Sequence, residues 1–395
     1  MTGVTEPVLR VSLDVGAVPP HPVGAGRYTL DLARALAARA DVSMLLWARR
    51  DDRSRWAAMG LAVHAREPVQ RPLRLAWEQV RLPRLLRGSD VAVHHGPHYT
   101  MPERAAVPVV VTVHDLTFLE HPEWHERVKV PVFRRAIAVA ARRAAALVCV
   151  SATTADRLRE RCDPVGRVFV VPHGVDRQRF TPDEPRAGAD RDALGRLGVH
   201  PPYVLFVGTI EPRKAVPVLV AAFDRIATRH PELRLVLAGR PGWGADALAQ
   251  ALGSARHRDR VVRLGYVGDE TVPVLLRNAA AVAYPALEEG FGLPALEALA
   301  CGAPLVTTTG TAMAEMAGEA ALLVPPGDAA ALAEALATAV DGGHGADRRR
   351  RLGLEVAAAH SWDASAAGHL AAYRWAAAYG RPAAAGTDRE RRRGR

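Results

Sequence analysis

The amino-acid sequence predicts an α/β protein made of two doubly wound, parallel-sheet domains. Its 395 residues exceed the usual size of one domain. Short runs rich in β-branched residues alternate with longer Ala-, Leu- and Arg-rich segments of helical spacing, which is typical of parallel sheets covered by helices. The alternation breaks at residues 181–200, which are rich in Pro, Gly, Asp and Arg. A linker with a short helix is expected there.

The two series of predicted strands have similar lengths. In the first half the strands are expected at 9–13, 42–47, 91–94, 107–113, 147–150 and 168–171. In the second half they are expected at 203–207, 233–238, 261–264, 281–284, 304–307 and 321–324. The expected domains are therefore 1–180 and 200–360. A helix at about 362–378 is expected to pack back on the first domain, and the basic tail 381–395 is expected to be disordered.

Composition narrows the class of protein. Apolar residues make up 49% and charged residues 24%, as in ordinary folded proteins. The sequence has neither a signal-peptide pattern nor an apolar run of about 20 residues, so no membrane-spanning helix is expected. Three cysteines do not make a disulfide framework. These features predict a cytoplasmic protein, with peripheral binding at the inner face of the cell membrane as a variant.

Positive charge is concentrated in the first domain. Residues 1–180 carry 27 basic and 18 acidic side chains, whereas residues 181–395 carry 25 and 24. An anionic acceptor or membrane surface could meet this charge, although solvated basic helices are the more ordinary interpretation. The candidate residues for such a patch are Arg71–Arg87, Lys129, Arg134, Arg135, Arg142 and Arg143. Nucleic acid is not expected, because aromatic residues are only 5% and no binding motif is present.

The strongest local motif follows the predicted strand 281–284. It contains Glu289, Gly290 and Gly292, and Glu297 lies eight residues after Glu289. The glycines allow a ligand close to the backbone, and the start of a helix attracts anionic groups. A capped helix with solvated acids is an equally good interpretation of the spacing alone.

This segment resembles the E-x7-E motif of GT4-type retaining glycosyltransferases, also called group 1 glycosyl transferases. Other segments share the resemblance, which extends over roughly residues 8–378: Gly24–Tyr28, Val113–Leu116, Val171–Asp176 and Gly208–Lys214. The resemblance implies two Rossmann-like domains that face each other across a cleft, the GT-B architecture. Within the family, the segment Gly208–Lys214 is most similar to bacterial mannosyltransferases.

The resemblance also assigns roles to individual residues. His114 and Glu289 are the implied catalytic residues, and Lys214 is implied to bind the donor diphosphate. Many relatives carry Arg where this chain has Thr209, and Arg213 is the candidate to replace it. The full set of implied donor-binding residues is Gly24, Gly26, Gly208, Thr209, Arg213, Lys214, Tyr266, Val267, Glu289, Gly290, Phe291, Gly292, Leu293 and Glu297.

Three other patterns in the sequence carry less weight than the resemblance to glycosyltransferases. The loop with Gly24 and Gly26 lacks the third glycine of a dinucleotide fingerprint, since Thr29 stands there. The histidines 94, 95 and 98 have spacings that a metal could use, but they lie in a segment rich in Pro and aromatic residues, so no metal site is expected. The pair Asp190 and Asp192 mimics an acidic metal motif but lies in the expected linker.

The resulting hypothesis is a retaining glycosyltransferase that moves a sugar from a nucleotide-diphosphate sugar to a glycan or a polyprenyl-linked acceptor. GDP-mannose is the expected donor, and cell-envelope polysaccharide synthesis is the expected context. Neither a metal nor another cofactor is expected, because the cations near Lys214 would offset the diphosphate charge. The alternatives are a sugar-nucleotide epimerase of the same architecture and a non-catalytic sugar-nucleotide-binding protein.

Overall fold

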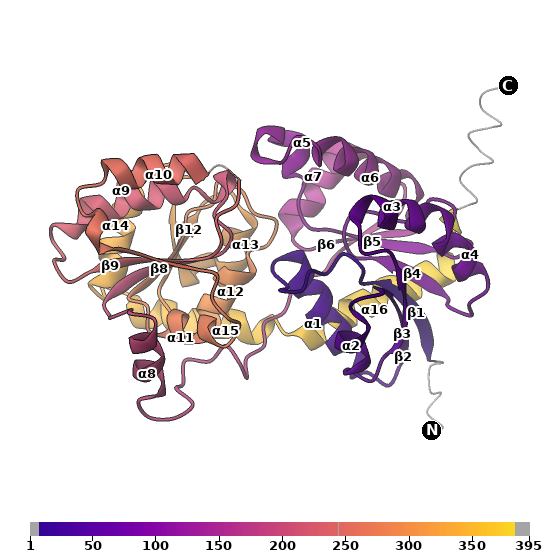
Figure 1. Cartoon of the computed structure of the whole chain (residues 1–395), viewed down its shortest axis with the longest axis horizontal. Helices are drawn as coiled ribbons and strands as arrows, with labels where there is room; N and C mark the ends of the chain where they lie inside the picture. The colour runs from indigo at the N-terminus through magenta and orange to yellow at the C-terminus, as the bar shows by residue number, and fades with distance from the viewer. Residues whose placement is uncertain (1–7, 244, 384–395) are drawn as a thin grey trace. The chain divides into compact units, whose positions relative to one another are not determined.

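The computed structural model describes residues 8–243 and 245–383, and most of the expected tail, 384–395, lies outside this part of the chain. The chain divides into two compact units (Figure 1). Unit 1 contains the described residues up to His173 together with those from Trp362 onward, and unit 2 runs from Gly174 to Ser361. Each unit is an α/β layer structure with an all-parallel sheet, so the predicted fold class is confirmed.

Unit 1 has a seven-stranded sheet in the order β3-β2-β1-β4-β5-β6-β7. Its strands are β1 (Leu9–Asp14), β2 (Val42–Arg49), β3 (Ala62–Glu67), β4 (Val93–Gly96), β5 (Val109–Val113), β6 (Ala146–Cys149) and β7 (Arg167–Val170). The strand order reverses between β1 and β4, which makes this the topological switch point. The prediction missed β3, because this edge strand reads as a polar and largely half-exposed segment rather than as an apolar run.

Helices cover both faces of this sheet. They are α1 (Ala25–Ala37), α2 (Arg53–Ala57), α3 (Arg71–Val80), α4 (Leu82–Arg87), α5 (Thr117–Glu120), α6 (Val130–Arg143), α7 (Ala152–Cys162), α16 (Trp362–Tyr379) and the 3-10 turn η1 (Pro122–Trp124). One core joins α1 and α16 to the sheet through residues such as Leu32, Leu36 and Leu370. A second core joins α4, α6 and α7 through residues such as Leu86 and Ile137.

Unit 2 has a six-stranded sheet in the order β10-β9-β8-β11-β12-β13, which reverses between β8 and β11. Its strands are β8 (Tyr203–Val207), β9 (Arg234–Ala238), β10 (Val261–Gly265), β11 (Ala281–Tyr284), β12 (Leu305–Thr308) and β13 (Ala321–Val324). They agree closely with the predicted series, because these strands are buried on both faces and read as short apolar runs.

The helices of unit 2 form two layers on its sheet (Figure 1). The helix α9 (Val216–Ala227) packs with α10 (Ala245–Ser254) and α14 (Ala329–Val340). The helix α11 (Thr271–Arg277) packs with α8 (Ala189–Arg196) and α12 (Leu293–Ala300), and α12 also packs with α15 (Ala346–Ala359). The remaining elements are α13 (Ala312–Ala317), η2 (Pro212–Lys214), η3 (Arg258–Arg260) and η4 (Gly318–Ala320). Across the described residues of both units, every helix is too short or too polar to span a membrane.

The segment expected as a linker is packed onto unit 2. In α8, the carboxylate of Asp190 accepts hydrogen bonds from both arms of the Arg277 guanidinium and from Asn278 Nδ2 at 2.8 Å. The Asp190 and Arg277 side chains are 8% and 6% exposed. Although burial opposes it, the hydrogen bonds from Arg277 and Asn278 lower the pKa of Asp190 below its ordinary value. The ion pair between Asp190 and Arg277 therefore joins α8 to α11.

We expect Asp190→Asn to lower the free energy of unfolding by about 3–5 kcal/mol, because the Arg277 guanidinium is left buried without its carboxylate. Since the pKa of Asp190 is lower in the folded state, its contribution is complete above the unfolded pKa of about 3.9 and is lost as the pH falls through the folded pKa. Urea unfolding between pH 3 and 7 measures both effects. The matched control is Asp192→Asn on the same helix, where the side chain is 59% exposed. Equal stability of the two variants would contradict this assignment.

Candidate functional site

The loop that follows β8 is built around close backbone packing. Gly208 has a φ of 144°, and a Cβ atom there would lie 2.9 Å from both Lys214 Nζ and the Tyr284 hydroxyl. A Cβ on Gly239, after β9, would lie 1.8 Å from the carbonyl oxygen of Gly208. Both positions therefore require glycine, and the absence of side chains brings the Lys214 ammonium against the end of the sheet.

Lys214 is a buried cation at the switch point of unit 2. Only 8% of the residue is exposed, and its Nζ donates to the hydroxyl oxygen of Tyr284 at 3.3 Å. The Tyr284 hydroxyl in turn donates to the carbonyl of Val207 at 2.8 Å. Burial lowers the pKa of Lys214, and the charge of Glu289 opposes this shift. A partly dehydrated ammonium held on a fixed phenol is well suited to bind an anionic group.

Arg213 connects the loops after β8 and β11. Its guanidinium forms ion pairs with Glu289 and, at 2.7 Å from Nε to Oε1, with Glu211. It also donates to the carbonyl of Glu288 at 3.3 Å, while the Leu287 amide donates to the Arg213 carbonyl at 2.7 Å. The sequence predicted a phosphate contact for Arg213 but missed this set of bonds. In the structure, Arg213 holds Glu289 in place.

The helix α12 begins as the motif predicts. Gly292 precedes it with a φ of 90°, and Pro294 lies in its first turn. A Cβ on Gly292 would come within 2.3 Å of Met313 Cγ, so this glycine is needed for packing as well as for its backbone angle. Glu297 is half-buried in the second turn, and its charge contributes to raising the pKa of Tyr284. Burial is the main reason why the pKa of Tyr284 is raised, and the charge of Glu289 raises it as that of Glu297 does, so both glutamates of the motif act on the same phenol.

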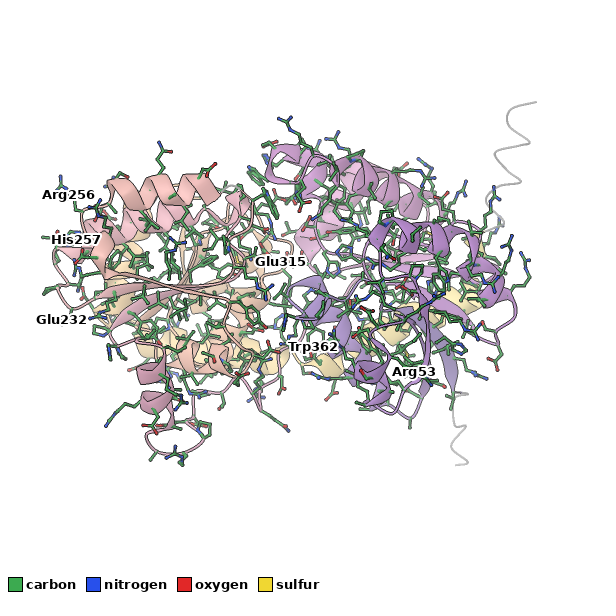
Figure 2. All side chains as sticks on the ribbon, viewed as in Figure 1. Arg53, Glu232, Arg256, His257, Glu315 and Trp362 are labelled. Carbon is green, nitrogen blue, oxygen red and sulfur yellow. The ribbon has the colours of Figure 1, made fainter. Side chains whose placement is uncertain are left out.

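The other predicted donor-binding residues of unit 2 differ in how far their side chains are exposed. Phe291 and Leu293 are 5% and 8% exposed, so their side chains belong to the core and only their backbone can meet a ligand. Gly290 is buried as well, whereas Thr209 and Val267 are half-buried. Tyr266, after β10, is 40% exposed and is the most accessible ring of the predicted set. Glu315, on α13, is exposed (Figure 2).

In unit 1, Gly24 and Gly26 lie at the start of α1. Gly24 has a φ of 51° and precedes the helix, and a Cβ on Gly26 would come within 2.8 Å of Pro19 Cδ. The loop before them is fixed by arginines that the sequence analysis did not single out. Arg49 donates to the carbonyl of Gly16 at 3.2 Å, and Arg55 donates to that of Pro19 at 2.8 Å.

His114 follows β5 and is half-buried. Its Nε2 donates to the carbonyl of Pro97 at 2.8 Å, so in the neutral ring Nδ1 is the hydrogen-bond acceptor. Burial lowers the pKa of His114, although the Pro97 carbonyl and Asp115 oppose the shift. The neighbouring Asp115 accepts from the Thr117 amide at 3.2 Å and from its hydroxyl at 2.9 Å. Asp115 therefore stabilises the turn that leads into α5.

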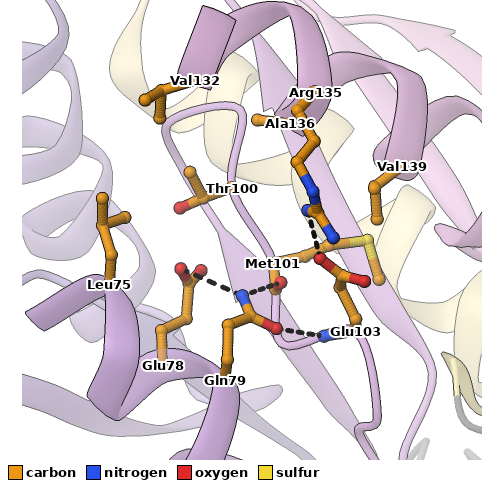
Figure 3. A pocket seen from close by; sticks show the side chains of 10 residues that line it. All are labelled: Leu75, Glu78, Gln79, Thr100, Met101, Glu103, Val132, Arg135, Ala136 and Val139. Atoms are coloured by element: carbon orange, nitrogen blue, oxygen red, sulfur yellow. Dashed lines mark hydrogen bonds and ion pairs between the residues drawn. The ribbon is translucent and has the colours of Figure 1, made fainter. Parts of the chain in front are cut away.

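A cavity of about 230 Å³ lies beside α3 and α6 in unit 1 (Figure 3). Its apolar side is formed by residues such as Leu75 and Val132, and Glu78 and Gln79 line its polar side. Burial and the charge of Asp14 raise the pKa of Glu78 to about 8, so this carboxyl is protonated at neutral pH. The side of the cavity formed by Glu78 and Gln79 is therefore nearly uncharged. None of the predicted catalytic or donor-binding residues lines the cavity.

Comparison with known proteins identifies the family. The family model "Glycosyltransferase Family 4" matches residues 22–179, and the model "Glycosyl transferases group 1" matches residues 201–341. The D-inositol 3-phosphate glycosyltransferase of Salinispora arenicola is 33% identical over 343 residues, which is 75% of each chain. The chain belongs to the group 1 glycosyltransferases. The predicted family and the predicted transferase activity are thereby confirmed.

Two further similar proteins match nearly the whole length of this glycosyltransferase. The O-antigen chain mannosyltransferase B of Escherichia coli is 27% identical over 379 residues, covering 89% of this chain and 96% of that protein. The solved structure of Anabaena HepE in complex with UDP-glucose has a TM-score of 0.71 and 18% identity, covering 92% of this chain and all of that one. The latter likeness concerns the fold.

In this glycosyltransferase, buried histidines link the last helix to unit 1. His369 on α16 bonds through Nδ1 to the carbonyl of Ser365 at 2.7 Å, so Nδ1 donates. Burial lowers the pKa of His369 to about 4, so the ring is neutral and its Nε2 accepts from the Tyr28 hydroxyl at 2.7 Å. The oxygen of Tyr28 then accepts from the Thr112 hydroxyl at 2.8 Å.

The chain of bonds continues one turn further along α16, at Tyr373. Since the Thr112 hydroxyl donates to Tyr28, its oxygen accepts from His95 Nε2 at 2.8 Å. His95 Nδ1 consequently accepts from the Tyr373 hydroxyl at 2.7 Å. Both ring nitrogens of His95 are thus hydrogen-bonded, and His94 Nδ1 bonds to the Ser12 hydroxyl at 2.8 Å. Among the described residues, no group of three potential ligands is arranged to hold a metal ion.

Tyr28→Phe is expected to lower the free energy of unfolding by about 1–3 kcal/mol, because Thr112 loses its acceptor and His369 its donor inside the core. Chemical denaturation of the purified protein measures the change. Tyr379→Phe removes the same atom from a side chain that is 74% exposed on α16, and should change stability by less than about 0.5 kcal/mol. A Tyr28 variant as stable as the Tyr379 variant would disprove the bonding pattern.

Proposed function

We propose that this glycosyltransferase moves mannose from GDP-mannose to a glycan or a polyprenyl-linked acceptor with retention of configuration. The observation that carries the donor class is the buried ammonium of Lys214, fixed on Tyr284 at the switch point of unit 2. Nucleotides bind at the carboxyl ends of parallel strands where the strand order reverses. The likeness to an O-antigen chain mannosyltransferase and to a structure that holds UDP-glucose supports a nucleotide-sugar donor.

In this proposal each end of the donor has its own residues. Lys214 and the amino-terminal end of α12 stabilise the negative charge that grows on the departing diphosphate. Glu297 accepts hydrogen bonds from the ribose hydroxyls. Glu289, which pairs with the Arg213 guanidinium, accepts from sugar hydroxyls as the anomeric carbon gains positive charge. In this proposal the positive charge of Lys214 and of the amino-terminal end of α12 takes the place of a metal ion.

His114 serves as a neutral partner of the transferred sugar in the proposal. Its Nε2 is used by the Pro97 carbonyl, so Nδ1 is the atom that can accept a sugar hydroxyl. Because the pKa of the ring is lowered, it stays neutral as the pH falls past the ordinary value of 6.5. His114 would thus orient the sugar and would not act as a general acid.

The lipid-linked acceptor and a peripheral membrane location are supported by α3. This helix exposes Leu73 and Val80, each 56% accessible, together with Arg71. Exposed apolar side chains on a helix that also carries an exposed arginine support binding to an anionic lipid surface. The α6 region offers less support than its sequence suggests, because Lys129 pairs with Glu126 and Arg135 pairs with Glu103.

Replacing Lys214 by Met is expected to lower kcat/KM about 100- to 1000-fold, because the departing diphosphate loses its buried cation. The assay combines nucleotide sugars with polyprenyl-linked glycans and measures the released nucleoside diphosphate. The matched control is Lys129→Met, since Lys129 is the other of the two lysines and its ammonium pairs at the surface. Conversion of the nucleotide sugar without an acceptor would instead indicate an epimerase, and binding without any turnover would indicate a non-catalytic protein.

Glu297→Gln is expected to weaken binding of GDP-mannose at least about tenfold, because a carboxylate accepts hydroxyl hydrogen bonds more strongly than an amide does. Thermal stabilisation by the donor measures the loss, with Glu315→Gln as the control from an exposed carboxylate on α13. Equal donor stabilisation of the wild type and the Glu297 variant would refute the ribose assignment.

A further inference from the structure

We infer that Arg240 gives this enzyme its preference for a guanine nucleotide, with Tyr266 as the platform that holds its guanidinium. Arg240 follows β9, and its Cζ lies 4.6 Å from the ring centroid of Tyr266, which follows β10. Arg240 is exposed and Tyr266 is 40% exposed, so a ligand can reach both. The sequence motifs did not connect these two residues, because 25 residues separate them.

The pair is joined directly to the proposed diphosphate site. The Ile210 amide donates to the Arg240 carbonyl at 3.0 Å, and the Gly242 amide donates to the Ile210 carbonyl at 2.8 Å. On the other side, the Gly239 amide donates to the Gly265 carbonyl at 2.7 Å. The loops after β8, β9 and β10 thus form one continuous edge. A nucleotide whose phosphates lie at β8 can place its base over the outer strands of this edge, about 10 Å away.

The choice of base follows from the hydrogen-bonding groups that an arginine presents. A guanidinium donates through a planar fork and never accepts, and stacking on an aromatic ring leaves this fork available. Guanine offers two neighbouring acceptors, O6 and N7, which match the fork. Adenine sets a donor beside N7 and therefore mismatches it. Uracil has no second acceptor next to its 4-carbonyl, so it can engage only one arm.

This inference rests on the proposed nucleotide-sugar donor, and calorimetric titration with GDP, UDP and ADP separates the two. We expect the wild-type protein to bind GDP at least about tenfold more tightly than UDP or ADP. Arg240→Lys keeps the charge but removes the fork, so GDP binding should weaken about tenfold while UDP binding changes less than about twofold. Arg229→Lys, in the exposed turn after α9, should bind all three nucleotides as the wild type does.

The outcomes of the titration are distinguishable. Equal or tighter binding of UDP by the wild type overturns the inference about Arg240 and leaves the proposed glycosyl transfer intact. Equal weakening of all three nucleotides in Arg240→Lys also overturns it, because the residue would then act on the shared phosphates. A folded wild-type protein that binds none of the three contradicts the proposed donor itself. Lys214→Met supplies the reference for a phosphate effect, since it should weaken all three alike.

Discussion

The burial of one ammonium group organises the donor side of this protein. Lys214 can lie at the end of β8 only because Gly208 has no side chain and because Tyr284 provides an oxygen. Tyr284 is positioned by the Val207 carbonyl, so this phenol adds a side-chain bond to the backbone pairing of β8 and β11 at the switch point. The desolvation of this cation is a cost to the folded state that an anionic ligand would relieve. Stability and binding are therefore opposed at this point in the fold.

Arg213 adds a second layer to that arrangement. A guanidinium between Glu211 and Glu289 fixes the carboxylate that the proposed function places beside the donor. Without it, Glu289 would add its negative charge to that of a diphosphate at short range. The arginine thus lets a carboxylate and an anionic ligand occupy neighbouring positions.

The sequence predicted the fold well where signals were local. Apolar runs located the buried strands, and the spacing of Glu289 and Glu297 located the start of α12. The sequence did not predict interactions between residues that lie far apart along the chain. The bond between Tyr28 and His369 joins residues 341 positions apart, and the ion pair of Asp190 requires Arg277 from another helix. The sequence also did not indicate that the side chains of Phe291 and Leu293, within the family motif, pack into the core.

The return of α16 to unit 1 has a consequence for how the chain folds as it is synthesised. Unit 2 is one continuous segment, Gly174–Ser361, and all of its strands have left the ribosome before α16 begins. Unit 1 starts first but must wait for Leu370 and Tyr373 to cover one face of its sheet. During that interval the face around Tyr28 and His95 is open to water. The last-made helix therefore completes the first-made domain, and a chain that stops after unit 2 would leave the earlier half as the aggregation-prone part.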